Sequence, residues 1–308
     1  PAVVDVSTTQ GISQRSSIAI VNSKGLDLST EVALSGLVVA AVVTNGQEMA
    51  NDYQIKLGQL DTLDSEALTK KAAETALGKL GGEVAPTGQY PVIFDSDALS
   101  DLLQTFCGIF SSEAAQKGLS KLAGKEGEVI ASEAVTLVDD PFHPENPMPM
   151  PFDAEGVATQ EKKLIDKGVL CTLLYDLTNA KKAGKQTTGN ASRAGVADPV
   201  SISPYCLRVE AGELSRDALF ERLGNGIYVT ELKGLHAGAD AVTGDFSIES
   251  AGFLVENGKL TRPVHSFTVA GNFFELLRAI DGVGKEVEAG LCAVSMLAAP
   301  DILVRGLS

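Results

Sequence analysis

The side chains that could bind a metal or act as nucleophiles are few and widely separated in this chain. The 308 residues include three histidines and four cysteines, namely His143, His236, His265, Cys107, Cys171, Cys206 and Cys292. A zinc site needs three or four imidazole, thiolate or carboxylate donors, often at short spacings such as CxxC. These residues show no such spacing, so spacing alone predicts no metal site. We expect the three histidines to be structural or surface residues.

The cysteines give no sign of a disulfide framework or of an activated thiol. Cys107 follows Phe106 on an apolar helical stripe, with no histidine near it in the sequence, which is typical of a small buried residue. We expect Cys171 in a core strand and Cys292 in a loop near the C-terminus. Scattered cysteines in a chain of this length fit a reducing compartment, so the predicted location is the cytoplasm.

Two polar segments resemble ligand sites only superficially. Residues 187–193 are rich in small side chains but lack the lysine of a phosphate-binding loop. We expect this segment to let another backbone approach closely. Asp153, Glu155 and Asp166 could bind a cation, but their spacing matches no Ca²⁺ loop, and we expect solvated acids in turns.

The charge balance excludes one large class of function. Lys and Arg number 25 against 40 Asp and Glu, which gives a net charge of −15. Direct binding of DNA or RNA is therefore disfavoured, because it needs clustered positive charge. Hydrophobic types make up 44% of the chain, enough for one large domain or two ordinary ones. The longest apolar run, residues 32–43, is shorter than the about 20 residues that cross a bilayer, and it predicts a buried strand pair and no membrane contact.

The first part of the chain is predicted to be a small sheet followed by a helix. Residues 1–60 have the pattern of strands joined by tight turns, and Asn45-Gly46 is a strong hairpin signal. A helix is expected over residues 64–80, where apolar residues recur every four positions and Asp64 or Ser65 can cap the first turn.

A linker is predicted at residues 83–90, which contain a proline and a glycine between the two patterned regions. We therefore divide the chain into residues 1–85, the remainder of an N-terminal domain, and residues 86–308, a C-terminal domain. The chain begins at Pro1 within strand-like sequence, so we expect the natural protein to extend further upstream.

The second region opens with a strand and a helix. After a strand at residues 91–94, Ser96 or Asp97 can cap a helix whose apolar stripe comprises Leu99, Leu102, Leu103, Phe106 and Phe110. Residues five apart on a regular helix point in different directions. A site that used both ends of residues 104–109 would therefore need a distorted helix, and we expect the distortion at Gly108.

Strands in the rest of the chain arrive mostly in hairpins. The expected elements are a strand at residues 129–138, a proline-rich surface loop at 139–153, hairpins around Lys167-Gly168 and Asn257-Gly258, helices at 177–183 and after Ser215, a helix cap at Asn272 and a strand at 302–304. Hairpins with few, separate helices favour an α+β fold with mainly antiparallel sheets.

Six short segments occur in an order that is specific as a set. They are residues 151–159 (PFDAEGVAT), 188–190 (TGN), 229–234 (VTELKG), 243–247 (TGDFS), 251–258 (AGFLVENG) and 269–272 (VAGN). Together they resemble the TldD/PmbA family, and within it the PmbA (TldE) branch. By this resemblance, residues before 82 are the later part of the family's N-terminal domain.

The resemblance implies that another chain carries the catalytic residues. Family members pair as TldD with TldE, cytoplasmic subunits that process or degrade unfolded peptides, and an older label is modulator of DNA gyrase. The TldD branch holds zinc through two helix histidines and a C-terminal cysteine, with a glutamate as base. The matching positions here are Gln104, Thr105 and Ile109, which supply neither ligand nor base. Cys292 lies near the place of the cysteine and is a candidate residual ligand.

The predicted function is that of a non-catalytic TldE-type subunit without a cofactor, with zinc in a TldD-like partner. We expect contacts with peptides, used in maturation or degradation, or with the partner at Thr188, Gly189 and Asn190. Two alternatives stay open: a metallopeptidase active by itself through a different metal site, and a direct modulator of DNA gyrase, which the acidic charge disfavours. A homodimer is a further assembly compatible with the sequence.

Overall fold

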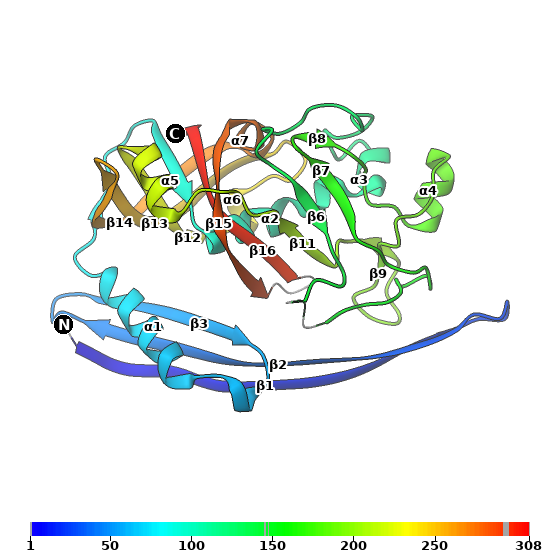
Figure 1. Cartoon of the computed structure of the whole chain (residues 1–308), viewed down its shortest axis with the longest axis horizontal. Coiled ribbons are helices and arrows are strands. Elements are labelled where there is room, and N and C mark those ends of the chain that lie inside the picture. Colours follow the sequence, from blue (N-terminus) through cyan, green and yellow to red (C-terminus); the bar gives the residue numbers. More distant parts are fainter. Residues whose placement is uncertain (1, 145, 147, 292–295, 308) are drawn as a thin grey trace.

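Two sheets make up most of the molecule, a three-stranded N-terminal sheet and an eleven-stranded one. The structure is a computed structural model that describes residues 2–144, 146, 148–291 and 296–307. Figure 1 shows the N-terminal sheet with helix α1 as one layer and the larger sheet with the other helices as the main body. The predicted α+β fold with mainly antiparallel sheets is confirmed.

The N-terminal sheet consists of three antiparallel strands. In order across the sheet they are β1 (Ala2–Val21), β2 (Asp27–Thr44) and β3 (Met49–Leu57). The predicted turns are confirmed, because the side chains of Asn22 and Asn45 each accept hydrogen bonds from backbone N–H groups two residues further on.

The strand pair expected at residues 32–43 is wrong, because these residues form the middle of the single strand β2. Gly36 does not interrupt the strand. A Cβ at this position would lie 2.8 Å from the carbonyl oxygen of Lys56, so the glycine lets β3 approach β2 closely.

Helix α1 (Ser65–Gly78) packs on β2 and β3 as its apolar pattern predicted. Leu68, Ala72 and Ala76 are buried on its inner face. The carboxylate of Asp64 caps the helix by accepting a hydrogen bond of 2.9 Å from a backbone N–H of the first turn.

The larger sheet has the strand order β4-β14-β13-β12-β5-β16-β11-β6-β7-β8, and β15 pairs with β16 off this path. The pairs β4–β14, β5–β12 and β11–β16 are parallel and the others antiparallel. The strands are β4 (Glu83–Val84), β5 (Tyr90–Phe94), β6 (Leu137–Asp139), β7 (Lys162–Asp166), β8 (Val169–Leu170), β11 (Cys206–Val209), β12 (Gly226–Lys233), β13 (Asp245–Glu256), β14 (Lys259–Asn272), β15 (Ile280–Leu291) and β16 (Met296–Leu307). A separate small sheet is formed by β9 (Ala191–Ser192) and β10 (Ser201–Ile202).

The helices of the main body are short, and several begin at the predicted caps. They are α2 (Ser96–Phe106), α3 (Ser112–Gln116), α4 (Leu177–Ala183), α5 (Arg216–Leu223), α6 (Leu235–Gly238), α7 (Phe273–Ala279) and the 3-10 helix η2 (Cys107–Phe110). A second 3-10 helix, η1 (Leu60–Thr62), contacts β2 of the N-terminal sheet. The side chain of Ser215 accepts from Ala218 N at 3.2 Å, and that of Asn272 accepts from Phe274 N at 3.0 Å.

The core of the main body fixes the position of α2. The ring of Phe106 stacks on that of Phe273, with 4.5 Å between their centroids, and Phe94 and Leu102 are fully buried beside them. Burying an apolar side chain of this size contributes about 1.5–3 kcal/mol. One face of α2 is therefore held inside the core, and its other face is left to the surface.

Two further strand predictions differ from the structure. The strand expected at residues 129–138 is mostly wrong, since only β6 forms there. The backbone N–H groups of Ile130 and Ala131 bond instead to Gly168 O in the turn between β7 and β8. Strand β15 is absent from the sequence prediction, because its glycines and charged residues interrupt any apolar alternation.

The predicted linker begins with the edge strand β4, which pairs with β14. Near it, Lys79 Nζ lies 3.9 Å from Glu231 Oε2 on β12. Leu26, in the turn between β1 and β2, lies against Gly156, where a Cβ would stand 2.5 Å from its side chain. The division of the chain at residue 85 stays a prediction.

In the part of the chain that the structure describes, no helix is both long and apolar enough to cross a bilayer.

Candidate functional site

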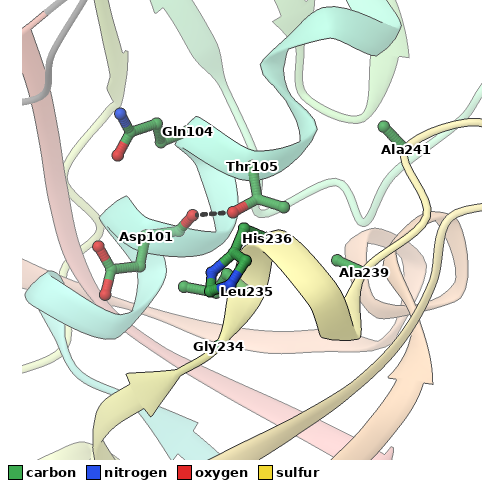
Figure 2. A pocket seen from close by; sticks show the side chains of 8 residues that line it. All are labelled: Asp101, Gln104, Thr105, Gly234, Leu235, His236, Ala239 and Ala241. Carbon is green, nitrogen blue, oxygen red and sulfur yellow. Dashed lines mark hydrogen bonds between the residues drawn. The ribbon is translucent and has the colours of Figure 1, made fainter.

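The candidate site is a surface pocket of about 560 Å³ between α2 and α6. Figure 2 shows the side chains that line it. They are Asp101, Gln104, Thr105, Gly234, Leu235, His236, Ala239 and Ala241. Gln104 and Thr105, two of the three positions predicted to match the family's zinc and base residues, therefore lie in this pocket.

The pattern of α2 explains which of its side chains reach the pocket. Its apolar stripe is buried in the core, as predicted. The predicted cap at Ser96 or Asp97 is wrong, because the carboxylate of Asp95 caps the helix by accepting from Ala98 N at 2.8 Å. Asp101, Gln104 and Thr105 follow the i, i+3, i+4 spacing, so they share the opposite face. All three are half-buried.

The predicted distortion at the end of α2 is confirmed, because the α-helix ends at Phe106 and continues as η2. The tighter turn directs Ile109 into the core, where it is 1% exposed. The third matching position is therefore separated from Gln104 and Thr105 and does not line the pocket.

Cys107, which follows this junction, is half-buried as a free thiol. Its Sγ donates to Gln104 O at 3.2 Å. Burial raises the pKa of the thiol, which keeps it protonated at neutral pH and disfavours a nucleophilic role. Cys171, expected in a core strand, is exposed just beyond β8, so that prediction is wrong.

Asp101 is the acidic group of the pocket. Burial, helped by the negative charge of Asp97, raises the pKa of Asp101 to about 6. The Thr105 hydroxyl donates to the backbone oxygen of Asp101 at 2.8 Å, and this bond orients the hydroxyl along the helix. The Asp101 carboxylate is thus partly desolvated and is ionised at neutral pH.

Helix α6 brings His236 to the same pocket. Gly234 precedes it with φ 75°, which sets the entry turn, and a Cβ on Gly238 would lie 2.5 Å from Ser247 O on β13. The helix is therefore seated directly on the sheet. Figure 2 shows the His236 ring next to Thr105 on α2.

His236 is a surface side chain, as expected, but its place beside α2 was missed by sequence reasoning. More than 120 positions separate it from the helix. The Gly-Leu-His-Ala-Gly sequence gave the only signal, since glycines on both sides of a histidine allow the backbone to approach another element.

The described residues of the pocket do not fit a zinc ion. Gln104 carries an amide, Thr105 a hydroxyl that already donates to the backbone, and Ile109 a buried alkyl group. Asp101 and His236 are two donors, one fewer than a catalytic zinc site takes from the protein. Elsewhere among the described residues, no three His, Cys, Asp or Glu side chains are grouped to hold a metal. Cys292, the candidate residual ligand, lies outside the described residues.

The segment predicted to contact peptides or a partner, Thr188 to Asn190, does not line this pocket and lies in a largely internal polar cluster. The Asn190 side chain is 0% exposed and donates to Asp139 Oδ2 at 2.7 Å and to Ser203 O at 3.0 Å. Thr188 donates to Asn190 Oδ1 at 2.8 Å. A Cβ on Gly189 would lie 2.6 Å from Ala158 O, which confirms the expected close approach of another backbone.

Buried carboxylates organise this cluster. Asp139 is 0% exposed and accepts from the backbone N–H groups of Tyr205 and Cys206, while Lys162 Nζ lies 3.0 Å from it. Asp139 therefore anchors the proline-rich loop that follows it. This polar cluster, named here the Asp139 cluster, comprises Asp139, Asp153, Lys162, Thr188, Asn190 and Ser203.

The expectation that Asp153 is a solvated acid in a turn is wrong. Asp153 is 1% exposed, and its two carboxylate oxygens accept from the backbone N–H groups of Glu155, Val157 and Ala191. Asp166 does lie in an exposed setting, with Lys163 Nζ at 2.8 Å. Neither carboxylate forms part of a cation site in the described structure.

Comparison with known proteins identifies the family. The PmbA/TldA metallopeptidase C-terminal domain matches residues 87–308, and the PmbA/TldA metallopeptidase central domain matches residues 1–80. The chain belongs to the PmbA/TldD metallopeptidase family, and the predicted resemblance is confirmed.

Among curated relatives, a "Metalloprotease" from Methanothermobacter thermautotrophicus is 31% identical over 295 residues, which cover 93% of this chain and 64% of the relative. "Metalloprotease PmbA" from Escherichia coli O157:H7 is 31% identical over 84% of this chain and 55% of its own length. The chain thus spans less than two thirds of either relative.

Two solved structures are similar over nearly the whole chain. One, from Thermotoga maritima MSB8, has a description that suggests modulation of a DNA gyrase; it is 36% identical with a TM-score of 0.92, over 99% of this chain and 69% of that one. TldE from Thermococcus kodakarensis is 28% identical with a TM-score of 0.88, over 96% of this chain and 67% of that one.

Proposed function

We propose that this chain is the non-catalytic, TldE-type subunit of a two-subunit peptidase that processes or degrades unfolded peptides. The observation that carries the proposal is the set of side chains at the end of α2. Gln104 and Thr105 line the pocket without metal-binding groups, and Ile109 is part of the core. A TldD-like partner supplies the zinc and the catalytic base.

The comparisons support this assignment at the level of the family. TldE is among the similar structures, and a TldD homologue from Haemophilus influenzae is among the similar sequences. The role of each subunit, the peptide substrates and the pairing itself are part of the proposal. A cytoplasmic location is also proposed, and free thiols at Cys107, Cys171 and Cys206 are consistent with it.

The subunit's contribution is to hold and present the peptide. The pocket between α2 and α6 offers polar groups at the position where a catalytic relative would carry its metal. Free strand edges offer backbone hydrogen bonds that accept peptides of varied sequence, and β1 pairs only with β2 within the described part of the chain.

The test is a mixing experiment with a fluorogenic unfolded peptide. The chain and a purified TldD-like protein are assayed separately and together, and zinc is measured in each sample. We expect cleavage to need the TldD-like protein and to rise when both are present. Cleavage by this chain alone at the rate of the mixture, at unchanged metal content, would contradict the proposal.

A metallopeptidase active by itself is the alternative, and the name "Metalloprotease" given to relatives favours it. It would use a different metal site that includes Cys292. One zinc per chain that is lost in Cys292→Ala would support this alternative. Zinc far below one per chain, in protein purified without chelator, would exclude it.

Modulation of DNA gyrase is a third candidate function, suggested by the names of two similar structures. The net charge of −15 opposes direct contact with a duplex. A filter-binding assay that detects salt-sensitive affinity for DNA would support this function.

The oligomeric state of the chain is a separate question. Light scattering of the chain alone distinguishes a homodimer from a monomer.

A further inference from the structure

The pocket between α2 and α6 carries a charge that the described structure leaves uncompensated. Asp101 is its acidic group, and its lining includes no Lys or Arg among the described residues. No ion pair or side-chain hydrogen bond is found for the Asp101 carboxylate within the described part of the chain. A partly buried carboxylate without a partner is costly, so its presence at a pocket wall points to a positively charged ligand.

The other polar groups of the pocket are also suited to bind a ligand that donates hydrogen bonds. The Gln104 amide offers a carbonyl oxygen, and His236 offers an unprotonated ring nitrogen in its neutral form. A lysine ammonium has three N–H donors and no acceptor, and a guanidinium has five donors. The pocket volume of about 560 Å³ lies within the range of about 300–1,000 Å³ that binds small ligands, so a long side chain fits.

The electrostatic field of the whole protein also favours a positively charged ligand. The net charge of −15 attracts basic segments and raises their rate of encounter with the surface. Once a basic side chain enters the pocket, the partly desolvated carboxylate binds it more strongly than a fully solvated one would.

We propose that this pocket is a subsite for the protonated side chain of a lysine or arginine in an unfolded peptide, with Asp101 as the charged contact and Gln104 and His236 as acceptors. This inference rests on the proposed peptide-handling function and names the substrate feature that the subunit recognises. Basic residues in the peptide would then be held at the position where catalytic relatives carry their metal, so the subunit would select peptides rather than cut them.

The test uses two fluorescently labelled, unstructured peptides that differ at one position, lysine against norleucine, which keeps most of the apolar stem and removes the charge. Binding to the 308-residue chain is measured by fluorescence anisotropy in buffer with EDTA, so that metal bridging is excluded. We expect the lysine peptide to bind about tenfold more tightly, the ratio that about 1.4 kcal/mol produces. An arginine and citrulline pair repeats the test for a guanidinium.

The matched variants are Asp101→Asn and Asp97→Asn, which remove the same charge from adjacent turns of α2. Asp97 is exposed and does not line the pocket. We expect Asp101→Asn to reduce the lysine preference to about onefold and Asp97→Asn to keep most of it. Circular dichroism and thermal melting confirm that both variants fold.

A direct probe covers the case in which peptide binding is weak. In a ¹³C-labelled sample, n-butylammonium should shift the carboxyl resonance of Asp101, whereas n-butanol at the same concentration should not. Equal affinity for the two peptides, or a lysine preference that survives in Asp101→Asn, would overturn the subsite, as would an unmoved Asp101 resonance.

These outcomes are separable from the test of the subunit role. A chain that stimulates its partner but shows no lysine preference refutes only the subsite. A chain with the lysine preference but no effect on a TldD-like protein refutes only the subunit role.

Discussion

The α2–α6 pocket and the Asp139 cluster are both rich in polar side chains, but they treat these groups in opposite ways. In the Asp139 cluster each carboxylate accepts hydrogen bonds from named donors and is almost fully buried. In the pocket, Asp101 is half-buried and faces open space. Satisfied polar groups hold a structure together, whereas an unsatisfied one at a pocket wall is available to a ligand.

A short sequence motif does not by itself show that its side chains are available to a ligand. The segment 188–190 (TGN) was predicted to contact peptides or a partner, yet the Asn190 side chain donates its hydrogen bonds to Asp139 and Ser203 inside the protein. The pocket has no recognisable motif of its own. A side chain is available to a ligand when it has no hydrogen-bond partner within the protein, and only the folded structure shows which side chains these are. The four predictions that follow test this contrast from the largest expected effect to the smallest.

Replacing the central carboxylate of the Asp139 cluster should have the largest effect. Asp139→Ala leaves the amides of Tyr205 and Cys206, and the ammonium of Lys162, without their acceptor in a buried place. We expect the free energy of unfolding to fall by about 3–5 kcal/mol, measured by urea denaturation. The control is Asp166→Ala, whose ion pair with Lys163 is exposed, and we expect a far smaller loss of stability from it. Equal losses in the two variants would contradict the assignment of the cluster as structural.

Introducing the zinc and base residues that the family resemblance implies should fail at one position. In the triple variant Gln104→His, Thr105→Glu and Ile109→His, the imidazole at 109 must enter the core, since Ile109 is 1% exposed. We expect a loss of about 3 kcal/mol and substantially less than one zinc per chain by elemental analysis. Ile109→Val, with a loss of about 0.5–1.5 kcal/mol, controls for packing alone. Stoichiometric zinc in the triple variant would show that residue 109 can reach the pocket.

A pair of glycine substitutions isolates the close approach of two backbones in the Asp139 cluster. Gly189 and Gly184 have similar φ values of 70° and 67°, but only Gly189 would place a Cβ against Ala158 O. We expect Gly184→Ala to cost about 1 kcal/mol and Gly189→Ala about 2–3 kcal/mol, because overpacking adds to the backbone strain. Thermal denaturation of both variants measures the difference. Similar losses would mean that residues 158 and 189 separate easily.

Asp101→Asn should have the smallest effect on stability, and unlike the other variants it should raise the free energy of unfolding. The pKa of Asp101 is raised from an ordinary 3.8 to about 6 in the folded chain, so the folded state favours its protonated form. The stability that this gives is complete below pH about 4 and is lost as the pH rises through about 6. Relative to the native chain, Asp101→Asn should therefore be equally stable at pH 4 and more stable at pH 8 by about 1 kcal/mol, which is well below the about 3 kcal/mol that an unscreened shift of this size would give, because the carboxylate is partly exposed to solvent.

Urea denaturation at pH 4, 6 and 8 follows this difference. A loss of stability at pH 8 would show that the Asp101 carboxylate is structural, like those of the Asp139 cluster, and would remove the contrast between the two regions.

Local signals made much of the fold predictable. The caps at Asp64, Ser215 and Asn272 and the turn at Asn45 were visible because each depends on residues within about four positions. The family resemblance then gave the prediction, still untested, that Gln104, Thr105 and Ile109 stand where the family carries its zinc and base residues.

The parts that could not be predicted depend on distant contacts. The partners Asp139 and Asn190 are 51 positions apart, and α2 and α6 meet across a longer separation still. No local pattern distinguishes Asp153 in a buried turn from a solvated acid. For β15, pairing with β16 overrides a sequence with little strand propensity of its own.

The burial of Ile109 has a consequence for how such a protein evolves. If Gln104, Thr105 and Ile109 occupy the zinc and base positions of the family, as proposed, metal binding there would need several substitutions, and the one at position 109 would destabilise the chain before any ion could compensate for it. Selection would therefore act against the destabilised variant before metal binding could offset its loss of stability. One aliphatic side chain, buried in the core beside a 3-10 turn, would then prevent such a chain from acquiring that metal site one substitution at a time.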